Sequence, residues 1–326
     1  MPEYKLREGW WWLRWPGHDD FDLVELVRIG ESLGLGDWAY RHENGEELVP
    51  LKSMINSISR LPGQPAHVVK SIEQLIEETR AFGVAPFYRG HRRFDWTLTP
   101  SVFRASCQND ERSMANDFRS RAPVRHANTP HDGDLCGWLS LAQHFGLPTR
   151  LLDWTMSPLI AAYFATEPDP VGHDRPGVIW VLNGATLNEL MIQRRVFFVF
   201  SMDTEAVASL VRPAFDDECS SPKHIIAVVP AERDMRMFVQ QSAFTLHGDT
   251  KPLEQWRAEL ISDEVEQRKL LQCAVIPPSC KPRIRDDLER LGIHEATLFP
   301  DLGNLARFVS RDKRNRKLDG DTPPSK

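Results

Sequence analysis

The chain has 326 residues, of which 41% are hydrophobic and 26% are charged, as is ordinary for a soluble globular protein. Its net charge of −6 does not mark it as a nucleic-acid binder, and no apolar run is long enough to span a bilayer. The N-terminus lacks the apolar core of a secretory signal, and five cysteines at irregular spacing argue against a disulfide framework and a zinc site. We therefore expect a cytoplasmic protein that binds no metal.

Residues 1–62 stand apart because they are rich in tryptophan, with Trp10, Trp11, Trp12, Trp15 and Trp38. We expect an N-terminal extension with a small accessory core, and an edge strand or docking surface at 10–15 is the alternative. Proline and glycine at 61–65 predict a linker. The main domain is expected over 67–310, and the basic, polar residues 311–326 are expected to form a disordered tail.

Hydrophobic periodicity and flanking residues predict a mixture of helices and short strands in the main domain. Helices are expected at 67–82, 135–144, 158–165, 232–241, 281–291 and 302–309, with Gly83, Gly146 and Gly292 as stop signals. Strands are expected at 84–88, 151–152, 177–182, 196–200, 224–229, 243–247 and 296–299. Because helices and strands do not alternate regularly, we expect an α+β fold with a mostly antiparallel sheet and flanking helices.

Polar side chains that carry chemistry are concentrated at 143–158, directly before an apolar stretch at 159–165. Burying such groups costs free energy unless partners satisfy them, so a segment that only filled a core would not need them. A second segment, 87–90, places Arg89 at the end of an apolar run with Gly90 directly behind it. These two segments are the candidates for a functional site.

The sequence contains no GxSxG, HExxH, Walker-type or GxGxxG pattern. His144 and Asp153 with a nearby serine match a hydrolase or nuclease site only weakly, and this remains an alternative. Residues 131–134, His-Asp-Gly-Asp, are more typical of a solvated loop than of a metal site.

A different set of residues fits cleavage of a nicotinamide–ribose bond. Arg89, expected on a strand, offers a rigid fork of donors for a phosphate or ribose. Thr155 and Ser157, just before a predicted helix, offer hydroxyls to the ribose side. Glu295, expected at the start of a strand, would supply the carboxylate that favours an oxocarbenium-like transition state, and an ordinary surface role is the alternative.

Three motifs resemble the FRG-domain family, which is named for its Phe-Arg-Gly signature. The opening motif is Phe87-Tyr88-Arg89-Gly90 followed by Trp96-x-Leu98-x-Pro100-Ser101-x-x-Arg104. The central motif is Gln143-His144-x-Gly146-Leu147-Pro148-Thr149-Arg150-Leu151-Leu152-Asp153-Trp154-Thr155, and the closing motif is Glu295-x-Thr297-Leu298-Phe299-Pro300-Asp301-Leu302. They occur in the family's order within residues 67–310. Tyr88, between the phenylalanine and the arginine, is a departure from the signature.

The same landmarks also resemble those of ADP-ribosyltransferases. In those enzymes a Tyr-Arg-Gly strand, a Ser-Thr-Ser before an Ala-x-x-Phe-Ala helix and a Glu-x-x-Leu-x-Pro strand line the NAD cleft. The resemblance implies a split, mostly antiparallel sheet with Arg89, Thr155 and Glu295 as catalytic residues. It also implies contacts to NAD, as the substrate, from a larger set: Arg89, Gly90, Arg104, His144, Arg150, Thr155 and Ser157.

The acceptor of the ADP-ribose is expected to be a macromolecule. Ile293 lies two residues before Glu295, where the usual family member carries the residue that selects the acceptor, and its apolar side chain disfavours modification of protein arginine. Arg92 and Arg93, with basic residues at 119–125, are expected to contact phosphates, so nucleic acid is slightly favoured.

The resemblance implies a bacterial toxin or phage-defence effector, with an antitoxin as partner and no membrane association. A non-catalytic module that binds a nucleotide or nucleic acid is the main alternative.

Overall fold

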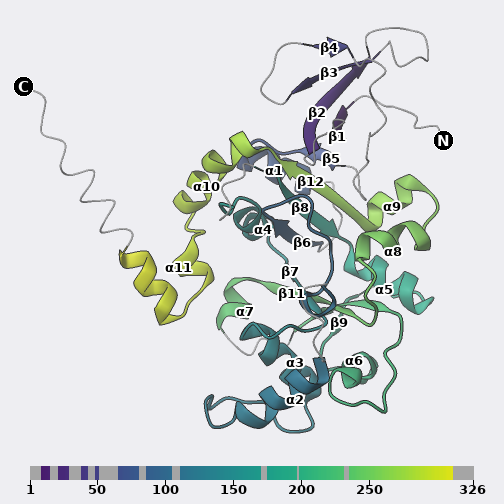
Figure 1. Ribbon diagram of the computed structural model, residues 1–326, viewed down its shortest axis with the longest axis vertical. Coiled ribbons are helices and arrows are strands. Elements are labelled where there is room, and N and C mark those ends of the chain that lie inside the picture. The colour runs from purple at the N-terminus through teal and green to yellow at the C-terminus, as the bar shows by residue number, and fades with distance from the viewer. Residues whose placement is uncertain are drawn as a thin grey trace, which may run out of the picture.

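The computed structural model describes residues 9–14, 21–28, 38–42, 48–50, 65–80, 86–104, 111–169, 175–196, 198–230 and 235–310. An N-terminal antiparallel sheet has strands in the order β1 (Gly9–Arg14), β2 (Phe21–Arg28), β3 (Trp38–His42) and β4 (Val49–Pro50). It lies at one end of the molecule, beside β5 (Pro65–Val68) of the main sheet (Figure 1). Lys70 Nζ is 5.4 Å from the ring centroid of Trp10. The side chains of Trp11, Trp12 and Trp15 lie outside the described residues. The linker was predicted at 61–65; residues 61–64 also lie outside the described residues, and Pro65 is the first residue of β5.

The main sheet has eight strands in the order β5-β12-β8-β6-β7-β11-β10-β9. Their bounds are β5 (Pro65–Val68), β6 (Phe87–His91), β7 (Leu151–Thr155), β8 (Gly177–Leu182), β9 (Phe200–Ser201), β10 (Ile225–Val229), β11 (Ser242–His247) and β12 (Leu271–Ile276). Neighbours are antiparallel except for the parallel pairs β12–β5 and β10–β9. The expected α+β fold with a mostly antiparallel sheet and flanking helices is therefore confirmed.

Helices surround this sheet on both faces (Figure 1). They are α1 (Ile72–Thr79), α2 (Glu111–Arg121), α3 (Leu135–His144), α4 (Pro158–Ala165), α5 (Gly184–Ile192), α6 (Glu205–Val211), α7 (Met235–Val239), α8 (Leu253–Leu260), α9 (Glu264–Leu270), α10 (Lys281–Arg290) and α11 (Glu295–Leu298). Residues 302–310 are also helical. Within the described part of the chain, no helix is long and apolar enough to cross a membrane.

The central strand β8 is buried along its whole length because both faces of the sheet are covered. On one face, Tyr88 and Ile179 pack in a core that includes residues of α4 and α10. On the other face, Phe87 and Trp180 pack in a second core with residues of α5 and β10. Neighbouring residues on β6 and β8 thus enter different cores, which explains why 177–182 is a continuous apolar run rather than an alternating one.

Helix α4 packs against the sheet backbone to backbone. A Cβ built on Gly90 of β6 would lie 1.8 Å from the carbonyl oxygen of Ala161, and one built on Gly177 of β8 would lie 2.2 Å from that of Ala165. Ala161 and Ala165 are themselves fully buried. Only a residue without a Cβ fits at positions 90 and 177, so both glycines serve the packing of α4.

Several predicted elements are confirmed and three are wrong. The helices at 135–144 and 158–165 and the strand at 177–182 lie where they were expected. The expected helix at 67–82 begins only at Ile72, after strand β5, and the expected strand at 196–200 shrinks to β9, with the Phe198 side chain 63% exposed. The expected strand at 296–299 is the helix α11, because the Thr297 hydroxyl accepts a hydrogen bond from the His294 N–H at 3.0 Å and closes a helical turn.

Candidate functional site

The strands β6 and β7 diverge at the centre of the main sheet. They pair only at Tyr88–Thr155, whereas β6 and β8 pair over five positions from Phe87–Leu182 to His91–Val178. Beyond that single pair the Arg89 side chain joins the two strands, since its NH1 donates a hydrogen bond to the Asp153 carbonyl oxygen. Its Nε donates to His91 Nε2 at 2.8 Å. The sheet is therefore split at this point, with a guanidinium in the split.

Arg89 carries a positive charge that is only partly neutralised. Its side chain is 17% exposed, and NH1 lies 3.9 Å from Asp153 Oδ2, a carboxylate that is itself 57% exposed. Burial lowers the pKa of Arg89 to about 10, Asp153 opposes this shift, and the positive charge of Arg104 adds to it. Arg89 remains protonated at neutral pH. The split therefore holds a fixed cation that could bind an anionic ligand in addition to its contact with the Asp153 carboxylate.

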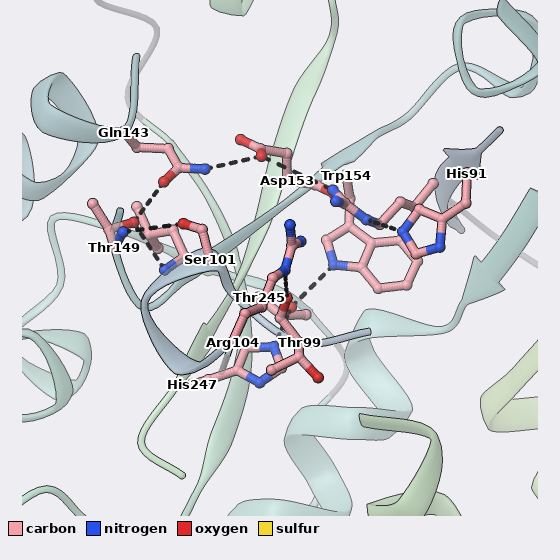
Figure 2. A network of polar contacts seen from close by, with 12 residues as sticks. His91, Thr99, Ser101, Arg104, Gln143, Thr149, Asp153, Trp154, Thr245 and His247 are labelled. Atoms are coloured by element: carbon pink, nitrogen blue, oxygen red, sulfur yellow. Dashed lines mark hydrogen bonds and ion pairs between the residues drawn. The ribbon is translucent and has the colours of Figure 1, made fainter. Parts of the chain in front are cut away.

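Two buried histidines beside Arg89 are neutral. Because a guanidinium only donates, His91 Nε2 must accept from Arg89. Trp154 Nε1 donates to Thr245 Oγ1 at 3.0 Å, and the same hydroxyl oxygen is hydrogen-bonded to His247 Nε2 at 2.8 Å (Figure 2). Burial lowers the pKa of His91 well below 6.5 and that of His247 to about 3, and Arg89 strengthens both shifts. Neither histidine can serve as a cation at neutral pH.

A chain of hydrogen bonds connects Asp153 with α3 and with the turn around Ser101. Gln143 Nε2 donates to Asp153 Oδ2 at 2.9 Å, and Thr149 Oγ1 donates to Gln143 Oε1 at 2.6 Å. The Thr149 N–H points to Ser101 Oγ at 3.4 Å (Figure 2). The polar side chains of the central motif thus act as hydrogen-bond partners for one another, and they fix the orientation of the Asp153 carboxylate.

Thr155 and Ser157 shape the turn from β7 into α4. The Thr155 hydroxyl donates to the Gln240 carbonyl oxygen at 2.7 Å and accepts from the Ser157 N–H at 3.1 Å. The Ser157 hydroxyl accepts from the Ile160 N–H at 3.4 Å as the N-cap of α4. Both hydroxyls that were expected to hold a ribose are therefore engaged in the backbone of this turn.

Glu295 is not brought together with Arg89. It lies on helix α11, which packs through Leu298 into the core beneath α4, whereas strand alternation places Arg89 on the opposite face with Phe87. Burial raises the pKa of Glu167, just after α4, and the nearby charge of Glu295 adds to that shift. Glu295 Oε1 also lies 3.8 Å from Arg307 Nε.

Arg150 and Gly90 have structural partners in place of the expected ligand. Arg150 Nε and NH2 donate to Glu111 Oε2 at 2.9 and 2.7 Å, and NH1 reaches Leu210 O and Ser221 Oγ at 3.2 and 3.0 Å. The expected phosphate contact of Arg150 is therefore corrected to a buried ion pair that ties α2 to β7. Gly90 faces the backbone of α4, so its missing side chain serves the packing of this helix.

The remaining predicted arginines are at or near the surface. Arg104 is exposed and donates through Nε to the Thr99 carbonyl oxygen at 3.1 Å. Arg93 forms two hydrogen bonds with Asp95, at 3.0 and 2.7 Å. Arg92 lies 5.0 Å above the Trp96 ring and 3.8 Å from Glu167. Acidic partners thus offset much of the positive charge that was expected for acceptor binding.

Two pockets border α3, and neither is lined by Arg89 or Asp153. The larger, of about 670 Å³, is formed between α2 and α3, and a smaller one of about 110 Å³ adjoins it and includes His144. The His144 ring meets the Phe145 ring edge-on with centroids 4.8 Å apart. Sequence reasoning missed these pockets, although the exposed Phe145 inside the central motif was a signal for them. Within the described ranges no cluster of His, Cys, Asp or Glu could hold a metal ion.

Comparison with known proteins identifies one family. Residues 85–173 match the family model of the FRG domain. The match contains β6, α2, α3, β7 and α4, and so includes the split, Arg89 and the Gln143–Asp153 chain. The closing motif at 295–302 lies outside it. No curated protein and no solved structure matched the chain.

Proposed function

Because residues 85–173 form an FRG domain, we propose that the chain is an NAD-dependent ADP-ribosyltransferase whose substrate binds at the split between β6 and β7. The reaction breaks the nicotinamide–ribose bond, releases nicotinamide and joins the ribose C1 to an acceptor nucleophile, which loses a proton. The observation that carries the proposal is the Arg89 guanidinium held in the split, charged and only partly neutralised.

Arg89 and Arg104 are the proposed pyrophosphate-binding residues. The positive charges of both arginines lower the pKa of the buried His91, and that of Arg104 also lowers the pKa of Arg89, which supports placing the two side chains at one site. Because His91 accepts the Nε–H of Arg89, the guanidinium is held in one orientation before any ligand binds. A preorganised donor loses little conformational entropy on binding an anion.

The reaction also requires a carboxylate near the ribose to stabilise positive charge in the transition state. The geometry favours Asp153 for this role over Glu295, because Asp153 is exposed, is oriented by Gln143 and lies 3.9 Å from Arg89. Asp153→Asn keeps an oxygen for Gln143 and removes the charge. Asp153→Asn should lower the rate of ADP-ribose transfer at least about a hundredfold, the scale of losing one preorganised electrostatic group. Glu295→Gln should keep the wild-type rate of transfer. A full loss in the Glu295 variant alone would return the catalytic role to α11.

The proposal is tested by incubating the protein with NAD labelled in its adenylate part and total cell extract. Nicotinamide release and label in the protein and nucleic-acid fractions are measured. The wild-type protein should release nicotinamide and transfer label to one of the two fractions, and Arg89→Ala should do neither. Arg80 has an exposed side chain away from the split, so Arg80→Ala should behave as wild type. If the chain is a toxin or defence effector, expression of wild type but not of Arg89→Ala should arrest growth. A wild type that neither binds NAD nor releases nicotinamide would refute the transferase proposal.

A non-catalytic nucleotide-binding module is the second candidate. The location of Glu295 on the α4 side of the sheet favours it, since the expected catalytic carboxylate is then missing from the split. Calorimetric titration with NAD and with ADP-ribose separates the two candidates. Binding of both ligands without release of nicotinamide, in the presence of extract, would establish the module and exclude turnover.

A further inference from the structure

The larger pocket lies between α2 and α3 and has apolar walls with a basic rim. Its volume is about 670 Å³, and its apolar side includes Phe118, Leu141 and Phe145. Phe145 is 56% exposed, although it sits at the C-cap of α3, in which six of the ten residues are buried. A large, well-formed pocket with an exposed ring is the kind of surface that binds a flat apolar group.

The Phe145 ring is held in place by other aromatic rings. Its centroid lies 6.4 Å from that of Phe118, 5.5 Å from that of His126 and 4.8 Å from that of His144, the two histidines meeting it edge-on. His126 and Phe145 line both the larger pocket and the adjoining one of about 110 Å³. The two pockets therefore form one trough with a fixed aromatic ring between them.

The rim of this trough is positive although the whole chain has a net charge of −6. Arg121 and Arg125 line it and their side chains are exposed, and the acidic group beside them is Asp117, which pairs with Arg121 at 3.0 Å. Arg125 NH1 donates to the Arg121 carbonyl oxygen at 2.7 Å, in the turn that follows α2, so both arginines lie at the same end of this helix. The rim can thus contact consecutive phosphates.

We propose that this trough binds single-stranded nucleic acid, with an unpaired base against Phe145 and the adjacent phosphates on Arg121 and Arg125. An exposed aromatic ring flanked by arginines is the arrangement that recognises unpaired bases, because every base offers a face for stacking. A duplex keeps its bases stacked on each other and offers the trough only its backbone.

The trough is connected to the split by one turn of chain. Gln143, two residues before Phe145, donates to Asp153, and Asp153 lies 3.9 Å from Arg89. Helix α3 therefore links the trough to the proposed NAD cleft, through the bond from Gln143 to Asp153. The inference rests on the proposed function only in naming the bound single strand as the acceptor.

The test measures fluorescence anisotropy of labelled oligothymidine, oligouridine and a hairpin duplex with the full chain, without NAD. Phe145→Ala should weaken binding of the single strands about tenfold or more, as the loss of one stacking side chain does. Arg121→Gln with Arg125→Gln should reduce the slope of log affinity against log salt by about 1.4, because each single-strand phosphate contact contributes about 0.7. The oligothymidine and oligouridine arms distinguish DNA from RNA as the strand.

Matched controls come from elsewhere on the surface. Phe198→Ala removes another exposed phenylalanine, and Arg80→Gln with Arg283→Gln removes two exposed arginines, and both variants should bind as wild type. Thermal unfolding confirms that each variant is folded. Wild type that binds no single strand, equal binding of duplex, or unchanged binding by Phe145→Ala would overturn the proposal. Single-strand binding with no labelling from NAD would leave the site standing and refute the transferase function instead.

Discussion

Replacing Gly90 with alanine tests whether this glycine packs a helix or contacts a ligand. The new Cβ would lie 1.8 Å from the Ala161 carbonyl oxygen and 2.7 Å from the Ala165 nitrogen, both in the backbone of α4. Carbon and oxygen do not approach much closer than about 3.3 Å, so α4 would have to retreat by about 1.5 Å. No side-chain rotation can relieve a clash between backbone and Cβ.

The expected cost follows from the packing of α4. Overpacking a core costs about 1–3 kcal/mol, and the upper end applies here because the obstacle is backbone. A retreating α4 would also lose contact with Tyr88 and Ile179 in the core beneath it. We therefore expect Gly90→Ala to lower the free energy of unfolding by about 3 kcal/mol, a large part of the 5–15 kcal/mol typical of a protein.

Urea denaturation followed by circular dichroism measures this change. With a urea slope of about 3 kcal/mol per M, the midpoint should fall by about 1 M. Gly133→Ala is the matched control, since its Cβ would meet only the His131 ring at 3.6 Å, and it should unfold as wild type. Equal midpoints for the two variants, or a Gly90→Ala protein that keeps its stability and loses only NAD binding, would refute the packing argument.

Three further predictions concern single side chains. Glu111→Gln leaves the Arg150 guanidinium buried without its counter-charge, so the free energy of unfolding in urea should fall by about 3–5 kcal/mol, while Glu77→Gln, in an exposed pair, should change little. The free energy of unfolding should fall as the pH drops below 6.5. In that range His247 becomes protonated in the unfolded chain, whereas in the folded protein its pKa of about 3 keeps it neutral. His247 contributes a limiting slope of about 1.4 kcal/mol per pH unit, to which the buried His91 adds, and His247→Gln but not a change of the exposed His131 should reduce the slope by that amount. Thr155→Val should cost about 1 kcal/mol, because the part-buried Gln240 carbonyl and Ser157 N–H lose the threonine hydroxyl as their partner. An unchanged NAD affinity in calorimetry would exclude a ribose contact.

Local sequence signals were sufficient for the elements that depend on near neighbours. The helix at 135–144 begins at an Asp134 cap and is followed by Gly146 at φ +83°, and both signals are readable from the residues alone. The apolar run at 177–182 likewise predicted a strand, and the structure buries all six of its residues. The FRG motifs identified the family from residue order, as the match over 85–173 confirms.

The site depended on contacts that no local pattern contains. Arg89 donates a hydrogen bond to Asp153, which is 64 positions away, and Arg150 pairs with Glu111, which is 39 positions away. One arginine therefore lies in the split and the other forms a buried ion pair, although the residue type is the same. The short pattern at 295–299 fits a strand or a helix equally, and α11 was decided by its capping bonds and by packing beneath α4. The sequence determined which residue types were present and which segments were helical or extended. Only tertiary structure decided which charges meet, because that depends on strand order and helix packing, which bring distant segments together.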